Sequence, residues 1–204
     1  EKKSDTDFTV LNLTDPQLGN GEWAEDAPNR KILEHTVKEL MEGAHPDLVT
    51  VSGDLAWAGH DHAYDMLAKF LDSFQIPWAP VWGNHDHQCG KESLLRAAAL
   101  LKEHPLCLLE DGDPAYGNGN YIITIDEEGT PVTALFMIDS HNSTEIEENG
   151  EKKWAYDKLW PNQLEWIGKE ASALKEKGYV DGLMMLHIPL YAYRLAAQKL
   201  FPEG

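Results

Sequence analysis

The sequence predicts one α/β domain in which a sheet packs on a second sheet and helices cover the outer faces. In the first half of the chain, three apolar runs each precede a segment with helical spacing of apolar residues, which is typical of parallel βαβ units. In the second half, two strand-like runs flank a short polar turn, which predicts an antiparallel hairpin and hence a mixed sheet. The 204 residues suffice for a single domain, residues 1–204.

The first half should contain three buried strands. The middle strand is almost entirely apolar before its Gly-Asp end, as expected for a strand that is covered on both faces. The strands are expected at Phe8–Thr14, Asp47–Asp54 and Trp78–Trp82. The helices that follow them are expected at Asn29–Glu42, Ala63–Phe74 and Lys91–Glu103.

The second half should add a hairpin, one helix and a last strand. Tyr121–Ile125 and Val132–Ile138 are strand-like and are separated by the turn-rich Asp126–Pro131. A helix is expected at Pro161–Lys177 and a final strand at Gly182–Leu186. We expect the acidic segment from Thr144 to Lys153 to be a solvated loop.

Composition narrows the possible partners. The formal net charge of −18 argues against binding to nucleic-acid backbones or to an anionic membrane, and no run is long enough to span a bilayer. A phosphorylated substrate would need a local cationic centre, for which a bound metal is the natural choice. Cys89 and Cys107 are expected to be free thiols. No leader-like segment is present, so a cytoplasmic location is favoured, with secretion after leader removal as the alternative.

Polar residues follow several of the predicted strands. Asp15 and Gln17 follow the first strand, Asp54 ends the second, Asn84 and His85 follow the third, and His187 ends the last. Ligands of open α/β sheets bind beyond the carboxyl ends of strands, so these side chains should share one rim. Hard oxygen ligands combined with imidazole suit divalent Mn, Fe or Zn.

These motifs resemble the calcineurin-like metallophosphoesterases, whose strand ends read D-x-H, G-D, G-N-H-D, a lone His and finally G-H-x-H. Gly53-Asp54 and Gly83–Asp86 match outright, Asp15-Pro16-Gln17 matches with Gln in place of His, and His187 matches the lone His. The runs Ile76-Pro77-Trp78, Ile138-Asp139-Ser140 and His187-Ile188-Pro189 are similar to the purple-acid-phosphatase-like branch. The resemblance implies a four-layer α/β/β/α sandwich with mixed sheets.

The resemblance also implies a role for each matching residue. Two divalent metal ions would be bound, with Asp15 and Gln17 at the first, Asp54 bridging both, and Asn84 and His187 at the second.

His85 would touch the phosphate or protonate the leaving oxygen, and Asp86 would fix the His85 ring. The implied function is hydrolysis of a small phosphate ester by water activated at the two metals. A phosphodiesterase or nucleotidase of the same family is the alternative enzyme, and a metal-binding module without turnover is the alternative from another class.

The chain departs from the family pattern in two ways. Gln17 is a neutral, weaker donor than imidazole, and no histidine follows His187, so the terminal G-H-x-H is absent. We interpret the sequence as a C-terminally incomplete version of the domain. Gly59–His62 spells G-H-x-H but precedes the third strand, so His60 or His62 is expected to border the cleft instead of replacing those ligands.

Three further side chains have ordinary structural interpretations. Trp57 and Trp82 adjoin the metal motifs, where core packing is expected and a substrate wall is the alternative. His141 follows a strand and is expected to have a loop role.

Overall fold

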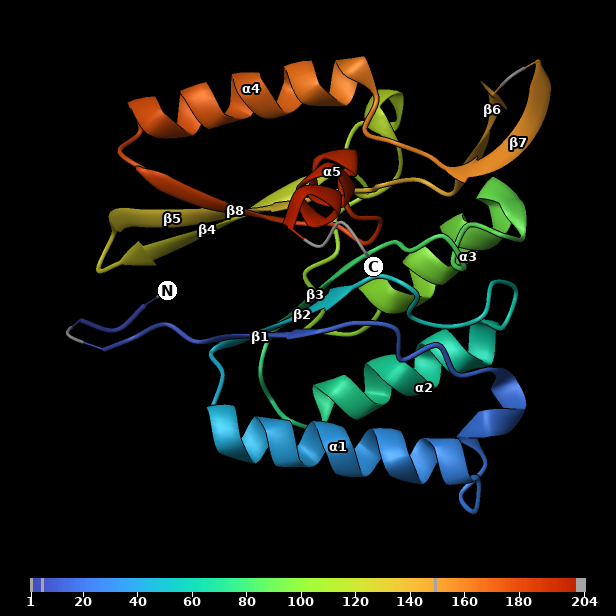
Figure 1. Ribbon diagram of the computed structural model, residues 1–204. Helices are drawn as coiled ribbons and strands as arrows, with labels where there is room; N and C mark the ends of the chain where they lie inside the picture. The colour runs from blue at the N-terminus through green and yellow to red at the C-terminus, as the bar shows by residue number, and fades with distance from the viewer. Residues whose placement is uncertain (1, 5, 149, 201–204) are drawn as a thin grey trace.

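The computed structural model describes residues 2–4, 6–148 and 150–200. Four layers lie on top of one another in Figure 1: a helix, a sheet, a second sheet, and further helices. This confirms the predicted α/β fold and its two packed sheets. The expected domain of residues 1–204, and its interpretation as incomplete beyond Gly204, reach outside the described ranges.

The first sheet contains β1 (Val10–Leu13), β2 (Leu48–Ser52) and β3 (Trp78–Val81), paired in parallel in that order. All five residues of β2 are buried, as its apolar sequence predicts. Its outer side is covered by α1 (Pro28–Ala44) and α2 (Asp61–Asp72), with α3 (Gly90–Lys102) beside them (Figure 1). Because the three strands run parallel, their carboxyl ends lie at one edge.

The second sheet contains β4 (Tyr121–Glu127), β5 (Thr130–Met137) and β8 (Asp181–Met185). It is mixed, since β4 and β5 are antiparallel whereas β5 and β8 are parallel. The helix α4 (Pro161–Glu176) covers its outer side (Figure 1). The Tyr121 hydroxyl donates a hydrogen bond to the Pro80 carbonyl at 2.6 Å and thereby joins the two sheets.

The two layers of apolar side chains differ in size. The larger cluster includes Val51, Trp78, Leu101 and Met137 and spans both sheets and the helices under the first. A smaller cluster lies around Ile138 and Leu174, between the second sheet and α4.

None of the described helices combines the length and apolarity needed to cross a membrane.

The structure differs from the sequence prediction at the acidic segment. Instead of a loop, β6 (Ser143–Glu148) and β7 (Glu151–Tyr156) form an antiparallel hairpin. The positive charges of β7 face the acidic residues of β6, for example Lys152 Nζ and Glu145 Oε2 at 2.8 Å, which favours pairing. A further helix, α5 (Tyr191–Leu200), and two short 3₁₀ helices, η1 (Asn20–Trp23) and η2 (Pro114–Tyr116), were not predicted either.

Candidate metal centre

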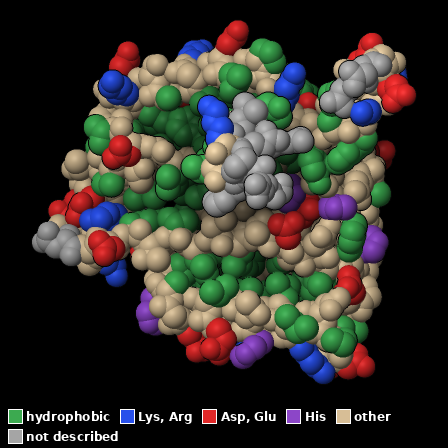
Figure 2. All heavy atoms as spheres, in the orientation of Figure 1, with side chains coloured by type: hydrophobic (Ala, Val, Ile, Leu, Met, Phe, Trp, Pro, Cys, Tyr) green, Lys and Arg blue, Asp and Glu red, His purple; other side chains and the backbone are tan. Residues whose placement is uncertain are grey.

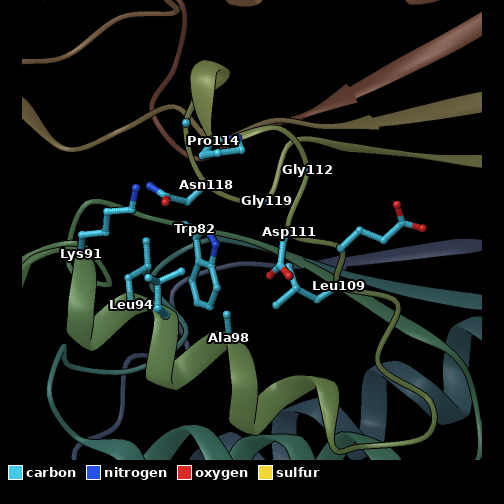
Figure 3. A pocket seen from close by; sticks show the side chains of 13 residues that line it. Trp82, Lys91, Leu94, Ala98, Leu109, Asp111, Gly112, Pro114, Asn118 and Gly119 are labelled. Atoms are coloured by element: carbon cyan, nitrogen blue, oxygen red, sulfur yellow. The ribbon is translucent and has the colours of Figure 1, made fainter.

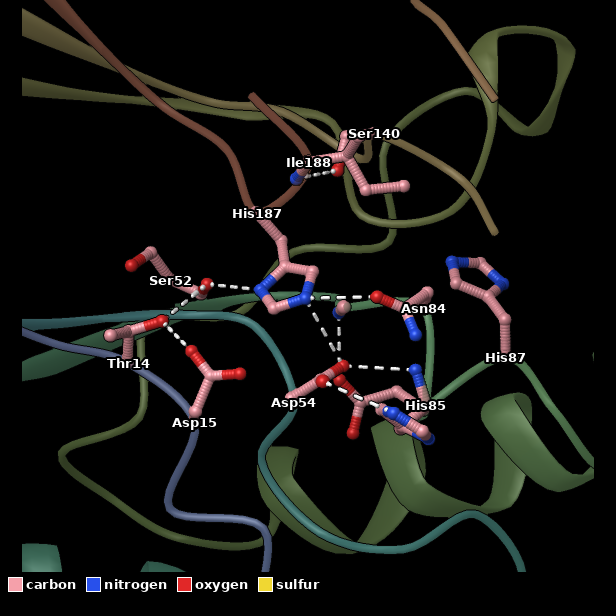
Figure 4. A network of polar contacts seen from close by, with 12 residues as sticks. Thr14, Asp15, Ser52, Asp54, Asn84, His85, His87, Ser140, His187 and Ile188 are labelled. Atoms are coloured by element: carbon pink, nitrogen blue, oxygen red, sulfur yellow. Dashed lines mark hydrogen bonds and ion pairs between the residues drawn. The ribbon is translucent and has the colours of Figure 1, made fainter. Parts of the chain in front are cut away.

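The carboxyl edge of the first sheet brings three of the predicted ligands together (Figure 4). Asp15 follows β1, Asp54 follows β2, and His187 arrives from the end of β8 in the other sheet. One potential ligand atom of each lies within 4.8 Å of the other two. Within the described ranges, this is the one group of three His, Cys, Asp or Glu side chains with such geometry.

The backbone at these positions is strained. Asp15, Gln17 and Asp54 have positive φ angles of 54°, 43° and 53°, in the left-handed region that residues with a Cβ rarely adopt. Two hydrogen bonds hold the turns together, from Asp15 N–H to the Gly53 carbonyl and from Gln17 N–H to the Asp54 carbonyl, both at 3.1 Å. Such strain costs about 1–3 kcal/mol per residue and concentrates at functional sites.

The glycines of the two motifs allow a close approach of the chain segments. A Cβ on Gly83 would overlap the Asp54 carboxylate. A Cβ on Gly53 would lie 2.5 Å from the Cβ of His187, and Gly53 also has a positive φ of 91°. Each motif therefore needs glycine directly before or beside its polar residue.

The His187 imidazole is oriented toward oxygen atoms. Its Nδ1 lies 2.9 Å from the Ser52 carbonyl oxygen, which can only accept a hydrogen bond. Its Nε2 faces Asn84 Oδ1 at 3.1 Å and Asp54 Oδ1 at 3.4 Å. With the proton of a neutral ring at Nδ1, the Nε2 lone pair meets two further acceptors, an arrangement that a proton or a metal ion at Nε2 would stabilise.

The same contacts shift the pKa values of His187 and Asp54. Burial alone would lower the pKa of His187, but hydrogen bonds with Asp54 and the Ser52 carbonyl outweigh it and raise the pKa to about 9. Burial alone would raise the pKa of Asp54, but hydrogen bonds from His187 and from His85 N–H, the latter at 2.9 Å, lower it. Without another cation, a proton therefore occupies this position at neutral pH.

Two polar atoms near this edge have no hydrogen-bond partner. They are Gln17 Nε2 and His85 Nδ1, both buried. Rotation of the Gln17 amide by half a turn would put its oxygen in the place of that nitrogen. Unpaired buried polar atoms, carboxylates and an imidazole facing oxygens form a donor set that fits divalent Mn, Fe or Zn.

The structure corrects the expected role of Asp86. Its fully buried carboxylate accepts hydrogen bonds from Gly83 N–H (2.7 Å), Leu55 N–H (3.1 Å) and the Tyr64 hydroxyl (2.8 Å). The described contacts include none with the His85 ring, whose Nδ1 is unpaired. Burial outweighs these hydrogen bonds and raises the pKa of Asp86 to about 6. Through these hydrogen bonds, Asp86 links the loop after β3 to the loop after β2 and to α2.

The two tryptophans beside the motifs differ. Trp82 is 1% exposed, which confirms core packing, whereas Trp57 is 38% exposed and its ring centroid lies 4.7 Å from that of His85. His60 accepts a hydrogen bond from Asn20 N–H at 3.0 Å, and neither His60 nor His62 belongs to the metal-ligand group.

A second polar cluster, the Asp139 cluster, was missed by the sequence analysis. Asp139 is completely buried and lies 2.9 Å from His87 Nε2, while its carboxylate also accepts from His141 N–H at 2.9 Å. His141 lies in the segment between β5 and β6, as expected, but its side chain is buried, with Nε2 2.7 Å from Gln163 Oε1. The sequence signals were the position of Asp139 directly after an apolar strand and the resemblance of Ile138-Asp139-Ser140 to the purple-acid-phosphatase-like branch, and neither indicated the partners of Asp139.

This cluster adjoins the edge of the sheet that carries Asp15, Asp54 and His187, which we call the metal-ligand edge. The neighbouring Ser140 hydroxyl accepts a hydrogen bond from Ile188 N–H at 2.9 Å and so fixes the segment that carries His187 (Figure 4). Behind Trp82, a pocket of about 300 Å³ opens between α3 and the segments from Leu109 to Gly119 (Figure 3). Figure 2 shows histidine and acidic side chains gathered to the right of the centre of the viewed face.

Several known proteins are similar to this chain in sequence. A phosphatase from Saccharomyces cerevisiae, DCR2, is 27% identical over 96% of this chain and 37% of its own length. A protein from Arabidopsis thaliana described as probable inactive purple acid phosphatase 28 is 26% identical over 94% of this chain and 56% of its own length. The chain thus spans only part of these relatives.

The fold has a solved counterpart in a dimetal phosphatase from Danio rerio. The two structures superpose with a TM-score of 0.57 at 16% sequence identity, covering 89% of this chain and 70% of the other. The profile of the calcineurin-like phosphoesterases, hydrolases that act on phosphate esters, matches residues 8–201. Because this match extends over almost the whole sequence, the chain belongs to the calcineurin-like phosphoesterase family.

Proposed function

We propose that the chain is the catalytic region of a phosphoesterase that hydrolyses a small phosphate ester with two divalent metal ions. The observation that carries the proposal is the convergence of Asp15, Asp54 and His187, with His187 Nε2 facing only oxygen atoms. Asp15 and Gln17 would hold the first metal, and Asp54 would bridge to the second, held by Asn84 and His187.

Divalent cations held by these residues would supply Lewis acidity, which would activate water and offset charge on the phosphoryl oxygens. The residues of the chain prepare the site for this. Ser52 holds the proton of His187 at Nδ1, and the depressed pKa of Asp54 keeps its carboxylate charged at neutral pH. The net charge of −18 repels phosphate, so cations at this edge also account for substrate binding.

His85 is the proposed proton donor to the leaving oxygen. Its side chain is 29% exposed, and its Nε2 lies 3.9 Å from Asp54 Oδ2, too far for a hydrogen bond, so Nε2 remains available to a substrate. A general acid of this kind contributes about 10²–10⁴-fold to the rate.

The test compares hydrolysis of phenyl phosphate and 4-nitrophenyl phosphate by the Mn²⁺-loaded protein and by His85→Ala. Phenolate is the poorer leaving group and needs protonation more, so the variant should lose at least about a hundredfold with phenyl phosphate and less with the nitrophenyl ester. His104→Ala, which removes a histidine paired with Asp72 away from the edge, is the control. An equal loss with both esters contradicts the role of His85, and bis(4-nitrophenyl) phosphate distinguishes a phosphodiesterase.

The second candidate is a metal-binding module without turnover. It is favoured by Gln17, where the family pattern has histidine, and by the Arabidopsis relative, whose description includes the word inactive. Metal binding without hydrolysis of any of the three esters would select this candidate.

A further inference from the structure

We propose that Trp57 is the residue that positions the His85 ring, in the place where the family motif suggests Asp86. The inference rests on the proposed function, because it concerns the orientation of the proposed proton donor. It follows from the surroundings of three side chains: His85, Asp86 and Trp57.

The His85 ring has no hydrogen bond to hold it among the described residues. Its Nδ1 is buried without a partner, and its Nε2 is 3.9 Å from the nearest Asp54 oxygen. An imidazole that must present one nitrogen to a substrate therefore depends on packing for its direction. Proton transfer is sensitive to geometry, and an error of about 1 Å can cost a hundredfold in rate.

Trp57 provides that packing. Its indole lies against the imidazole with ring centroids 4.7 Å apart and planes at 74°, the edge-to-face arrangement that aromatic rings prefer. This contact restricts rotation of the His85 ring about its side-chain bonds while leaving Nε2 free.

Trp57 is itself held by a rigid turn. The two residues before it donate backbone hydrogen bonds to Asp86, from Leu55 at 3.1 Å and from Ala56 at 3.4 Å. The Trp57 carbonyl accepts from His60 N–H at 3.0 Å. Asp86 thus acts on His85 indirectly, because it fixes the turn that carries the indole.

A second tryptophan–histidine pair offers a matched control. Trp160 is also 38% exposed, and its ring stacks on His141 with centroids 3.8 Å apart. Unlike His85, His141 has a side-chain hydrogen bond at Nε2, to Gln163. Loss of Trp160 should therefore leave its histidine oriented. Because both indoles are partly exposed, neither replacement empties a core position.

The experiment compares Trp57→Leu, Trp57→Phe and Trp160→Leu in the Mn²⁺-loaded protein. Trp57→Leu should lower kcat for phenyl phosphate by about ten- to a hundredfold, with a smaller loss for 4-nitrophenyl phosphate, and with KM and metal content within about twofold. Trp57→Phe should restore most of the rate, since an aromatic ring remains. Trp160→Leu should leave kcat within about twofold.

A kcat for Trp57→Leu within about twofold of the unmodified protein, or equal losses in Trp57→Leu and Trp57→Phe, would overturn the inference. Ring mobility, measured by ¹³C NMR relaxation of His85 in the Zn²⁺-loaded proteins to avoid the paramagnetism of Mn²⁺, separates this outcome from failure of the proposed function. If the metal-loaded protein hydrolyses no ester, the proposed function fails. In that case greater His85 mobility in Trp57→Leu than in Trp57→Phe supports the positioning role, and equal mobility overturns it.

Discussion

The metal-ligand edge and the Asp139 cluster both place histidines against a buried aspartate, yet their hydrogen bonding is opposite. In the Asp139 cluster each partner has a complement: His87 at 2.9 Å, Asn118 N–H at 2.8 Å and His141 N–H at 2.9 Å all face the carboxylate. At the edge, His187 Nε2 faces oxygens, while Gln17 Nε2 and His85 Nδ1 have no partner.

We interpret this difference as that between a structural cluster and the proposed ligand site. Buried polar groups are nearly always paired. A cluster whose polar groups all have hydrogen-bond partners (a saturated cluster) stabilises the fold, whereas a cluster with unpaired groups (an unsaturated cluster) needs a bound ligand or ion to complete it. The strained φ angles of Asp15, Gln17 and Asp54 belong to the unsaturated region. Mutations in the two regions should therefore have their main effects on different measured quantities.

The largest effect is expected for Asp54→Asn. It removes the charge shared by the proposed metals and should lower kcat/KM for phenyl phosphate by about a thousandfold or more. In the metal-free protein the variant should also lower the unfolding free energy, because it removes the charge partner of His187. Asp126→Asn, distant from the edge, serves as the control, and full activity of Asp54→Asn would contradict the assignment.

Asp139→Ala should act mainly on stability. It leaves His87 and the Asn118 amide without their buried partner, and loss of one member of a buried pair costs about 3–5 kcal/mol. Urea unfolding measures the change. Asp111→Ala, whose exposed carboxylate pairs with Lys102, should cost no more than about 1 kcal/mol. Equal costs at the two positions would remove the distinction between the clusters.

Metal addition should stabilise the edge selectively. Mn²⁺ at a hundred times its dissociation constant should raise the unfolding free energy by about 2.7 kcal/mol. Thermal unfolding with and without Mn²⁺ should show this shift in the unmodified protein and in Asp139→Asn. His187→Gln should lose much of it, and an unchanged shift in that variant would exclude His187 as a ligand.

The smallest expected effect is a pH dependence of the free energy of unfolding that arises from the Asp139 cluster. Burial would raise the pKa of Asp139, but hydrogen bonds with His141 and His87 outweigh it and hold the pKa well below its usual value. The unfolded chain then binds the proton more readily, so this stabilisation is complete above about pH 5 and decreases as the pH falls.

From its unfolded pKa of about 3.9, Asp139 should contribute about 1 kcal/mol less at pH 3 than at pH 7. On the alkaline side, His141 has a raised pKa despite its burial, chiefly because it bonds to Asp139, so its contribution is lost as the pH rises through that pKa. Urea unfolding across pH should show a flatter acid limb for Asp139→Asn than for the unmodified protein. Parallel curves would contradict the charge pairing.

Local pattern sufficed for most strands and helices and for the position of the rim, whereas the four-layer arrangement was implied by the family resemblance. Gly53-Asp54 and Gly83-Asn84 end apolar strands, and strand ends of a parallel sheet must meet, so the convergence with Asp15 follows from topology. The metal-binding and catalytic roles of these residues stay predictions.

The direction of a side chain was not accessible from the sequence. Asp86 follows His85 directly, but its carboxylate turns to Tyr64 on α2, a donor that adjacency does not reveal. The Asp139 cluster joins residues separated by 52 positions, His87 and Asp139, so only the tertiary fold brings them together. The β6–β7 hairpin carries a charge pair across its strands, Lys152–Glu145, which the acidic composition of β6 concealed.

The most direct test of the central claim is a calorimetric titration of the protein with Mn²⁺, repeated for Asp54→Asn and Asp139→Asn. If the unsaturated edge is the metal site, the unmodified protein and Asp139→Asn bind Mn²⁺ with similar affinity, and Asp54→Asn binds at least about a hundredfold more weakly. Equal binding by all three proteins would contradict the account, because it would place the metal away from Asp54.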